Sequence, residues 1–354
     1  MYQPKYTITN KLLKSINQII QAHALIVNAP LKPRWEAGLK HRALVKSVHS
    51  STHLEGNPLT EQEVDQVLQG KKTKRKFRKR DVFEVTNYHE VLQFISEAYN
   101  DPKLVINEAA IRHLHKLCMK NIEKMENEAG KYRMVQNYIV SGRDRQPIYT
   151  PPPAQDVPAL MKDLVEWIQK AEQEEVSPFI ISAIAHYEFE SIHPFVDGNG
   201  RTGRALATLI LYKMGYDTKS LFSLEEYFDT YPEQYYGQLN KIRKSYHESP
   251  HADLTEWTEF FVQAIGVEMK GVETEIKEYL QQEELRTHVK RQEINSRQFK
   301  AVKHLQKNGS LQSHEYAKRF KCSRDTAVRD LNELLERELI KTEGSGPQLR
   351  YVLK

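Results

Sequence analysis

Apolar residues recur at intervals of three and four positions through most of this 354-residue chain, for example across residues 91–95 and 160–168. An α-helix turns once in about 3.6 residues, so this spacing places apolar side chains on one helical face. The pattern predicts a mainly α-helical fold. The chain is 39% hydrophobic and 28% charged, which suits a globular protein with more than one domain and excludes a disordered or collagen-like chain.

The longest apolar stretch, Ala205–Tyr212, is too short for a membrane-spanning helix, and the N-terminus has no secretory h-region. We therefore expect no membrane association and a cytoplasmic location. The two cysteines, Cys118 and Cys322, are far apart, which argues against a disulfide framework or a cysteine zinc site.

One strand-rich segment interrupts the helical pattern. Residues 134–149 carry β-branched and aromatic residues on both sides of a predicted Ser141-Gly142 turn, which indicates a β-hairpin. Three prolines, Pro151–Pro153, end the second strand, and a helix resumes near residues 156–157. A further helix is predicted from Ser177, whose hydroxyl is expected to cap it.

That helix leads into SIHPFVDGNGRTGR, residues 191–204, and then into an apolar helix that Gly215 is expected to end. The backbone amides of Gly198, Asn199 and Gly200 would lie at a helix N-terminus, where unpaired N–H groups and the helix dipole favour an anion. The motif thus predicts an anion-binding loop between two helices.

Four further side chains surround these amides: His193, a candidate base; Asp197, a candidate Mg²⁺ ligand; and Arg201 and Arg204, which share one face of the first helical turn. Each feature alone is common in structural loops and solvated helix faces. Their occurrence within twelve consecutive residues instead favours nucleotidyl or phosphoryl transfer.

The segment HPFVDGNGRTGR resembles the signature of Fic-domain proteins, H-x-F-x-[D/E]-G-N-G-R-x-x-R, and every defining position matches. The wider resemblance covers roughly residues 30–270. It implies that the base is His193, that Asp197 holds Mg²⁺, and that Arg201 and Arg204 bind the β- and γ-phosphates of ATP. Gly198, Asn199 and Gly200 would form the anion-binding nest.

The resemblance implies an adenylyltransferase that transfers AMP from ATP to a Ser, Thr or Tyr hydroxyl of a target protein, or of the chain itself, and releases pyrophosphate. The kinase-like Doc branch alters the G-N-G-R part, which is intact here, so nucleotidyl transfer is favoured over phosphate transfer. The family also implies that the predicted hairpin is a flap that holds the target by strand addition, against the alternative of an ordinary surface hairpin. A homodimer is left open.

Upstream, Ser51 and Glu55 are four residues apart and would share a helical face that Gly56 ends. One interpretation is a helix C-terminus that happens to carry an acidic residue. Beside a Fic motif, the segment resembles the inhibitory [S/T]-x-x-x-E-[G/N] element, in which the glutamate pairs with the second motif arginine, here Arg204. In related proteins this glutamate also supports AMP removal, so a de-AMPylase or a bifunctional enzyme is the alternative.

Residues 294–354 predict three helices and a short hairpin, an order that resembles a winged helix-turn-helix. Residues 290–354 contain 15 Lys and Arg against 8 Asp and Glu, a local charge of +7. Arg324, Thr326 and Arg329 would begin the recognition helix and contact DNA, although such modules also bind proteins. A DNA-binding regulator, switched by nucleotide binding or self-modification, is the second functional hypothesis.

These patterns divide the chain into an N-terminal helical region with the inhibitory helix (1–90), a Fic-type helical catalytic core with the hairpin flap (91–270), a linker helix (271–293) and a winged-helix domain (294–354). A second basic cluster, Lys71–Arg80, holds eight cations in ten residues. We interpret it as a solvated loop or helix face rather than a nucleic-acid arm.

Overall fold

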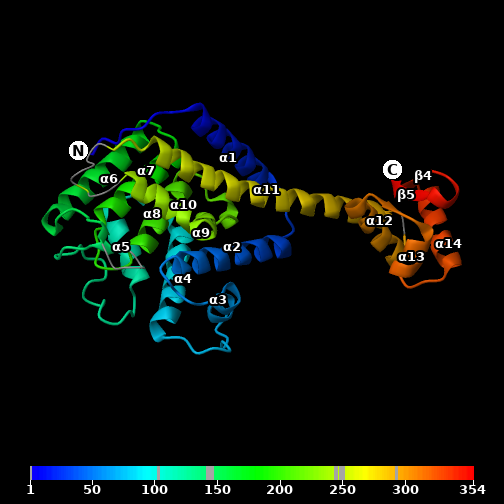
Figure 1. Ribbon diagram of the computed structural model, residues 1–354, viewed down its shortest axis with the longest axis horizontal. Coiled ribbons are helices and arrows are strands. Elements are labelled where there is room, and N and C mark those ends of the chain that lie inside the picture. The colour runs from blue at the N-terminus through cyan, green and yellow to red at the C-terminus, as the bar shows by residue number, and fades with distance from the viewer. Residues whose placement is uncertain (1, 102–103, 141–146, 243–245, 247–251, 292–293) are drawn as a thin grey trace. The chain divides into compact units, whose positions relative to one another are not determined.

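A computed structural model describes residues 2–101, 104–140, 147–242, 246, 252–291 and 294–354. These residues form two compact units, 1–276 and 277–354 (Figure 1). The fold is mainly helical, as the apolar spacing predicts. None of the described helices combines the length and the apolar composition that crossing a membrane would require.

The first unit is a helical assembly around two buried helices. Its helices are α1 (Asn10–Asn28), α2 (Pro33–His53), α3 (Glu61–Leu68), α4 (Lys79–Ala98), α5 (Glu108–Cys118), α6 (Val157–Gln173), α7 (Pro178–Ile192), α8 (Asn199–Lys213), α9 (Leu224–Thr230), α10 (Pro232–Ile242) and α11 (Thr255–Arg291), which continues into the second unit. Short 3₁₀ turns, η1 (Ala154–Asp156) and η2 (Thr218–Ser220), precede α6 and α9.

Helices α7 and α8 form the centre of this unit. Every residue of α7 from Phe179 to Ile192 is buried, which is the pattern of a helix that is covered on all sides. Helix α8 packs against α7, α5, α4, α2 and α9 (Figure 1). The loop that joins α7 to α8 is therefore held by a rigid core on both sides.

Local sequence accounts for the ends of these two helices. Pro178 occupies the first turn of α7, where its missing N–H costs no bond. The expected cap differs in detail, because the Ser177 backbone carbonyl accepts the first helical bonds while its hydroxyl makes no cap bond. Helix α8 ends before Gly215, which adopts a φ of +89° that glycine tolerates best.

The predicted hairpin is present as two short antiparallel strands, β1 (Ile139–Val140) and β2 (Pro147–Tyr149), with Ile139 paired to Tyr149. The predicted Ser141-Gly142 turn lies outside the described residues. Helix α6 resumes at Val157 after the prolines, at the predicted place.

The second unit contains α12 (Ser296–Asn308), β3 (Ser310–Leu311), α13 (Ser313–Arg319), α14 (Arg324–Glu336), β4 (Ile340–Glu343), a 3₁₀ turn η3 (Gly346–Gln348) and β5 (Arg350–Leu353). The three helices and terminal hairpin agree with the sequence pattern, but the short strand β3 was not predicted. It joins an antiparallel sheet with the order β3-β5-β4. Buried Asp330 accepts bonds from Tyr316 and Arg297 and so ties α14 to the other two helices.

Candidate active site

The loop between α7 and α8 turns sharply at two residues with positive φ. His193 ends α7 with a φ of +50°, and Gly198 opens α8 with a φ of +76°. A Cβ atom at Gly198 would lie 2.6 Å from the Met119 sulfur, so only glycine fits there without a shift. These two turns bring the ends of the loop together at the N-terminus of α8.

Phe195 anchors the loop to the core. Its ring is fully buried and stacks on the His115 ring, with centroids 3.7 Å apart. The Asn199 side chain accepts a bond from the Phe195 N–H at 2.9 Å and donates one to the Phe195 carbonyl at 2.8 Å. Asn199 is thus a clamp for the loop as well as a contributor of a helix N-terminal amide.

His115, which carries no local sequence signal of a site, supports the same loop. Its Nε2 lies 2.9 Å from the Asp197 carbonyl, and its Nδ1 accepts a bond from the Gly130 N–H at 2.8 Å. Burial lowers the pKa of His115 to about 4, so the ring is neutral at pH 7. A neutral ring with a proton on Nε2 satisfies both partners.

The candidate base His193 lies at the end of α7, with its side chain 20% exposed. Its Nδ1 is 3.9 Å from a carboxylate oxygen of Glu190, one turn earlier. Its carbonyl accepts a bond at 2.9 Å from the buried guanidinium of Arg133. Arg133 fixes the backbone here, and sequence reasoning missed it because it lies 60 residues away.

Arg201 is a buried cation in the first turn of α8, with only 1% of its surface exposed. Its nitrogens lie 3.5 Å from a Glu84 oxygen and 3.7 Å from an Asp197 oxygen. Two of them, Nε and Nη1, have no hydrogen-bond partner among the described residues. A buried guanidinium with unused donors is the feature expected of an anion-binding site.

Arg204, one turn further along α8, is equally buried but well bonded. Its Nε donates to the Ser51 hydroxyl at 3.0 Å, and its Nη2 donates to the Ser51 carbonyl at 2.8 Å and to a Glu55 carboxylate oxygen at 2.9 Å. Burial, the largest single influence, would lower the pKa of Arg204. The charge of Glu55 and three neighbouring tyrosines together outweigh it and raise the pKa well above its usual value.

The structure therefore brings the predicted Ser51 and Glu55 to Arg204, across about 150 residues of sequence. One expectation changes: α2 ends at His53, so Glu55 lies in the following turn rather than on the helix. A Cβ atom at Gly200 would lie 2.2 Å from a Glu55 oxygen. The carboxylate thus packs directly onto the first turn of α8, at the positive end of its dipole.

Asp197 lies in the same loop, next to Arg201. Its carboxylate accepts a bond from the Gly198 N–H at 2.6 Å and one from Arg80 at 2.5 Å. Burial would raise the pKa of Asp197, but Arg201 and Arg80 outweigh it and hold the pKa below its usual value. Arg80 ends the basic cluster 71–80, which is otherwise a mostly exposed loop, as interpreted from the sequence.

The remaining predicted site residues belong to the second unit. Arg324 and Arg329 are exposed at the beginning of α14, and Thr326 is half-buried in its first turn. The Ser323 hydroxyl accepts a bond from the Thr326 N–H at 3.2 Å and so caps the helix.

Gly200→Ala tests the contact between Glu55 and α8. In the wild-type background we expect about 1–2 kcal/mol of destabilisation, because the new methyl group must displace the carboxylate. In a Glu55→Gly background the same change should cost clearly less. The carboxylate is gone, only the end of the Arg204 side chain, 3.0 Å away, must shift, and alanine stabilises a helix relative to glycine by roughly 0.5–1 kcal/mol. Thermal and denaturant unfolding of wild type, Gly200→Ala, Glu55→Gly and the double variant would measure these changes in stability. An equal change in both backgrounds would contradict the contact.

Residues 105–211 match the model of the Fic/DOC family. Proteins named protein adenylyltransferase Fic from Drosophila grimshawi and Drosophila melanogaster are 27% and 28% identical to this chain over 177 and 182 residues, half of its length. The chain spans only about a third of these curated relatives, 35% and 34% of their lengths.

Solved structures agree with this match. A Fic family protein from Desulfovibrio desulfuricans is 27% identical, with a TM-score of 0.63 over 100% of this chain and 98% of that chain. A fragment of Fic-1 from C. elegans, 22% identical with a TM-score of 0.57 over 76% of this chain and 73% of its own, shares the fold. The chain therefore carries a domain of the Fic/DOC family at residues 105–211.

Proposed function

We propose that the chain is a protein adenylyltransferase that transfers AMP from ATP to a Ser, Thr or Tyr hydroxyl of a target protein, and that Glu55 inhibits it. The observation that carries this proposal is the pair of buried guanidiniums, Arg201 and Arg204, at the N-terminus of α8. Together with the helix amides they supply positive charge suited to a polyphosphate. His193 lies at the other end of the same short loop.

In the proposed reaction, His193 accepts the proton of the target hydroxyl while the hydroxyl oxygen attacks the α-phosphorus of ATP. The bond from this phosphorus to the oxygen that bridges it to the β-phosphorus breaks. AMP becomes esterified to the target, and pyrophosphate leaves with the bond's electron pair. Arg201 and Arg204 would hold the β- and γ-phosphates, so the transferred group is positioned by the part of ATP that departs.

The residues present also fit Mg²⁺. Among the described residues no group of three or more His, Cys, Asp and Glu could hold a metal, so Asp197 would be the protein ligand and phosphate oxygens and water would supply the rest. Mg²⁺ usually binds through one or two carboxylates and substrate phosphates. When bound there, it would neutralise charge on the leaving pyrophosphate. Asp197 is suited to this role because its pKa is lowered and its side chain is 34% exposed.

Inhibition follows from the position of the Glu55 carboxylate. It lies on Gly200 and pairs with Arg204, where the γ-phosphate would otherwise bind. Two anions cannot share this position, because both need the same guanidinium. Since Arg204 is buried, its charge-assisted bond to Glu55 contributes roughly 1.5–3 kcal/mol, enough to oppose a phosphate. Removing Glu55 should therefore allow productive ATP binding.

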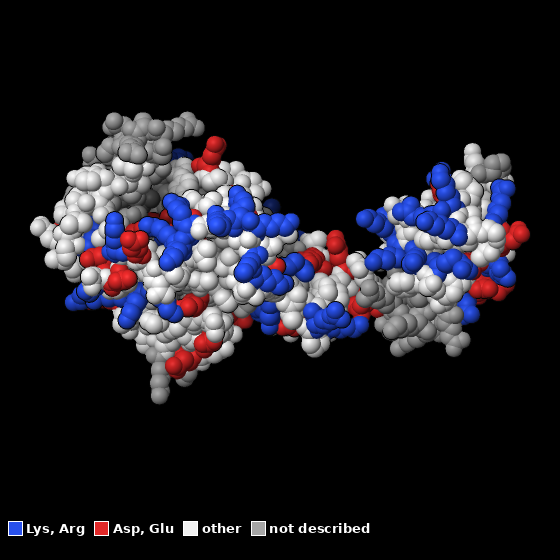
Figure 2. Space-filling model, turned by 90° about the horizontal axis from the view of Figure 1, so that it is seen from below, with Lys and Arg blue, Asp and Glu red and all other residues white. Residues whose placement is uncertain are grey.

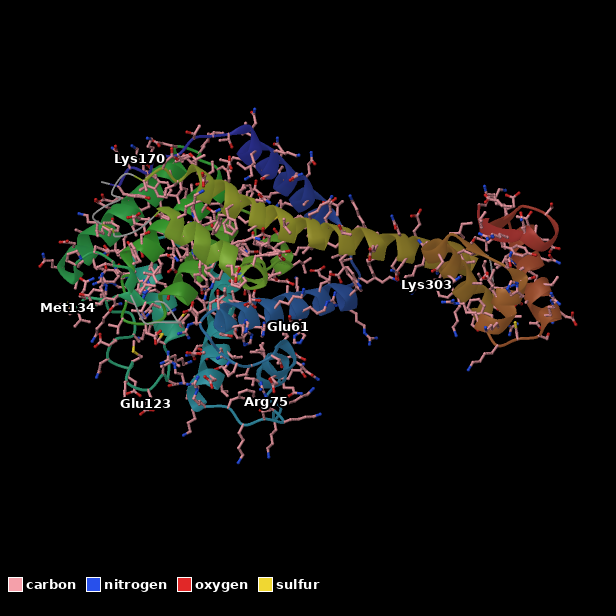
Figure 3. The ribbon with its side chains drawn as sticks, in the orientation of Figure 1. Glu61, Arg75, Glu123, Met134, Lys170 and Lys303 are labelled. Carbon is pink, nitrogen blue, oxygen red and sulfur yellow. The ribbon has the colours of Figure 1, made fainter. Side chains whose placement is uncertain are left out.

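The hairpin offers a surface for the target. Met134, Tyr138, Val140 and Ile148 expose 89%, 59%, 47% and 42% of their surfaces beside the active-site loop, and Met134 is seen at the edge of the first unit (Figure 3). Asn137, which precedes Tyr138, donates a side-chain bond at 2.8 Å to the Phe195 carbonyl and so links the start of the hairpin to the active-site loop. A target strand added to β1 or β2 would place a hydroxyl near His193.

Intact mass spectrometry after incubation with Mg²⁺ and ATP tests the enzyme, the base and the inhibition together. We expect Glu55→Gly to gain the mass of one or more AMP groups, and the double variant Glu55→Gly/His193→Ala to gain none. Wild type should gain at least tenfold less than Glu55→Gly, which corresponds to about 1.4 kcal/mol at Arg204. Equal labelling of wild type and Glu55→Gly would exclude the inhibitory role. A double variant labelled as strongly as Glu55→Gly would exclude His193 as the base.

AMP removal is the alternative activity, because Glu55 is 31% exposed and can hold a water molecule while bound to Arg204. A second arm of the experiment separates the two. Self-modified Glu55→Gly protein is freed of ATP and mixed with wild type. Loss of the AMP mass would favour the bifunctional or de-AMPylase alternative, whereas a stable modification would favour transfer alone.

Arg80 is expected to compete with the metal. Its guanidinium bonds the Asp197 carboxylate at 2.5 Å and Glu84 at 2.9 Å, and its side chain is 45% exposed. In a Glu55→Gly/His193→Ala background, which should transfer no AMP, Arg80→Ala should lower the Mn²⁺ concentration that half-saturates the protein–ATP complex about threefold to fivefold, matching ~1 kcal/mol for an exposed ion pair. Electron paramagnetic resonance of free Mn²⁺ measures this without turnover. Arg78→Ala, which removes a neighbouring charge paired with Asp81, should have no effect.

A DNA-binding role for the second unit is the second candidate function. The exposed Arg324 and Arg329 at the start of α14 favour it, as does the local charge of +7 at residues 290–354. Figure 2 shows Lys and Arg gathered over the face of this unit that is in view. The order of helices and strands suits a winged helix-turn-helix, in which the third helix enters the major groove.

Fluorescence anisotropy with a labelled DNA duplex at several salt concentrations tests this role. Changing Arg324 and Arg329 together to alanine should weaken binding at least tenfold and reduce the slope of log K against log salt by about 2. Lys307→Ala, which removes an exposed charge from α12, should change both the affinity and the salt slope less than the double variant does. If the wild-type protein does not bind DNA at low salt, the alternative is that this unit binds a protein partner.

A further inference from the structure

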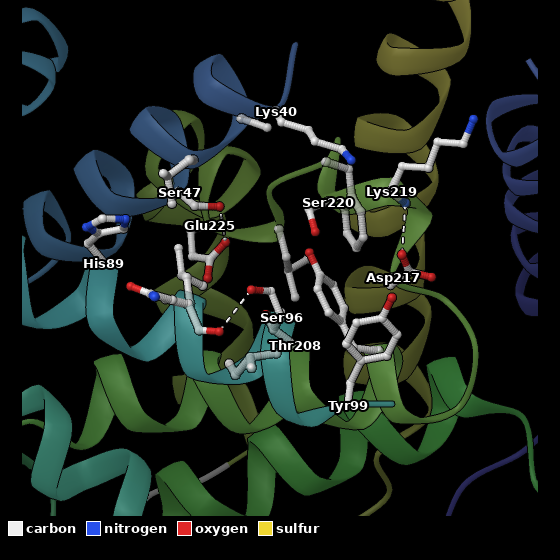
Figure 4. Close-up of a pocket in the computed structure, with 18 of the residues that line it drawn as sticks. Lys40, Ser47, His89, Ser96, Tyr99, Thr208, Asp217, Lys219, Ser220 and Glu225 are labelled. Atoms are coloured by element: carbon white, nitrogen blue, oxygen red, sulfur yellow. Dashed lines mark hydrogen bonds between the residues drawn. The ribbon is translucent and has the colours of Figure 1, made fainter. Parts of the chain in front are cut away.

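A cavity of about 490 Å³ lies in the first unit behind α2, the helix that precedes the inhibitory Glu55. Residues from α2, α4, α8 and the segment from η2 to α9 line it. Its volume is within the range of small-molecule sites. Figure 4 shows Lys40 and Lys219 at one end and Thr208 and Tyr99 at the other.

The backbone that borders this cavity is strained. Thr218, Lys219 and Ser220 have φ values of +47°, +55° and +57°, three consecutive left-handed residues without a glycine. For a β-branched residue such as Thr218 this conformation is a genuine outlier. The side chain of Asp217 accepts a bond from the Lys219 N–H at 3.1 Å and helps to hold the turn. Such strain persists where surrounding structure imposes it, and it clusters at ligand sites.

The lining indicates the class of ligand. Leu92, Ile95, Phe222 and the ring of Tyr99 supply apolar and aromatic walls, while the hydroxyls of Thr208 and Ser220 supply polar groups. The charged groups at the cavity already have partners of their own. Lys40 pairs with Glu36 at 2.8 Å, and His41 pairs with Asp65 at 2.6 Å. The Lys219 ammonium donates to the Ala29 carbonyl at 3.3 Å, and Asp217 accepts a bond from the Lys219 N–H. Glu225 is bonded by Ser47, Tyr88 and Ser223. A neutral ring-containing molecule therefore fits better than an anion.

Glu225 and Tyr88 lie between the cavity and the contact of Glu55 with Arg204. Glu225 in its wall accepts a bond from Ser47 of α2 at 3.2 Å and from the Tyr88 hydroxyl at 2.7 Å. The Tyr88 hydroxyl also interacts with Ser51 and with the charge of Arg204. Arg204 bonds both Ser51 and Glu55. A molecule that shifts Glu225 or α2 would act on groups that hold Arg204.

We propose that this cavity binds a neutral molecule with an aromatic body and a hydrogen-bonding group, and that its occupancy is coupled to the contact between Glu55 and Arg204. The binding site stands independently of the proposed adenylyltransferase activity. The coupling rests on the role proposed above for Glu55. Both parts can be measured without nucleotide.

The probe is N-phenyl-1-naphthylamine, a neutral aromatic amine whose fluorescence rises in apolar sites, titrated into the full chain. We expect saturable one-to-one binding. Its sulfonated analogue, 1-anilinonaphthalene-8-sulfonate, should bind at least fivefold more weakly. Ser96→Trp should abolish binding, because Ser96 is an exposed residue of the lining whose hydroxyl bonds only within α4, so a ring there fills the cavity.

Two matched variants keep the test decisive. Glu97→Trp places the same ring one residue along α4, outside the lining, and should bind the probe as wild type does; Ser96→Ala should also bind it. Equal melting temperatures would show that all variants fold. Probe binding that survives in Ser96→Trp, or no saturable binding to wild type, would overturn the site.

Coupling is read from the probe affinity of Glu55→Gly. Because coupling between two sites is reciprocal, loss of the Glu55 contact should change the dissociation constant of the probe at least fivefold. An unchanged constant would overturn the coupling while leaving the site intact. Failure of Glu55→Gly to gain AMP in the mass experiment would instead count against the proposed enzyme, so the two failures are distinguishable.

Discussion

Two arginine side chains are buried at the positive end of a helix, and the arrangement around them follows from that constraint. Arg201 and Arg204 each expose 1% of their surface at the start of α8, where the helix dipole adds to their charge. A buried charge without a partner costs several kcal/mol, so the fold must supply anions. It does so from two directions, with Glu84 and Asp197 beside Arg201 and with Glu55 on Arg204.

This constraint explains why inhibition and substrate binding would use the same group. A phosphate and a carboxylate both satisfy a buried guanidinium, so in the proposed enzyme Glu55 would neutralise Arg204 at the place where the γ-phosphate would bind. Arg204 is also bonded by the Ser51 hydroxyl and carbonyl, which remain when the carboxylate leaves. Glu55 can therefore be exchanged for a phosphate without leaving the guanidinium bare.

The sequence predicted the local parts of this site well and the long-range parts unevenly. Glycine, proline and apolar spacing act within a few residues, so the ends of α7 and α8 and the helices of the second unit could be predicted. The contact between Glu55 and Arg204 was anticipated only through the resemblance to a known family. His115, Arg133 and Arg80 carry no local signal, because they reach the loop from 60 to 117 residues away, and only the packing of α4 and α5 on α8 brings two of them there.

The buried residues near the C-terminal end of α2 differ in kind from those of the apolar α7. In α2 these buried positions are small and polar: Ser47, Ser50, Ser51 and Thr52, with Val48 among them. Hydroxyl groups can exchange one hydrogen bond for another over short distances, whereas large interlocked apolar side chains resist such shifts. The end of α2 can thus adjust at lower cost than the apolar α7. The cavity that the same helix borders leaves space on its inner side for that adjustment.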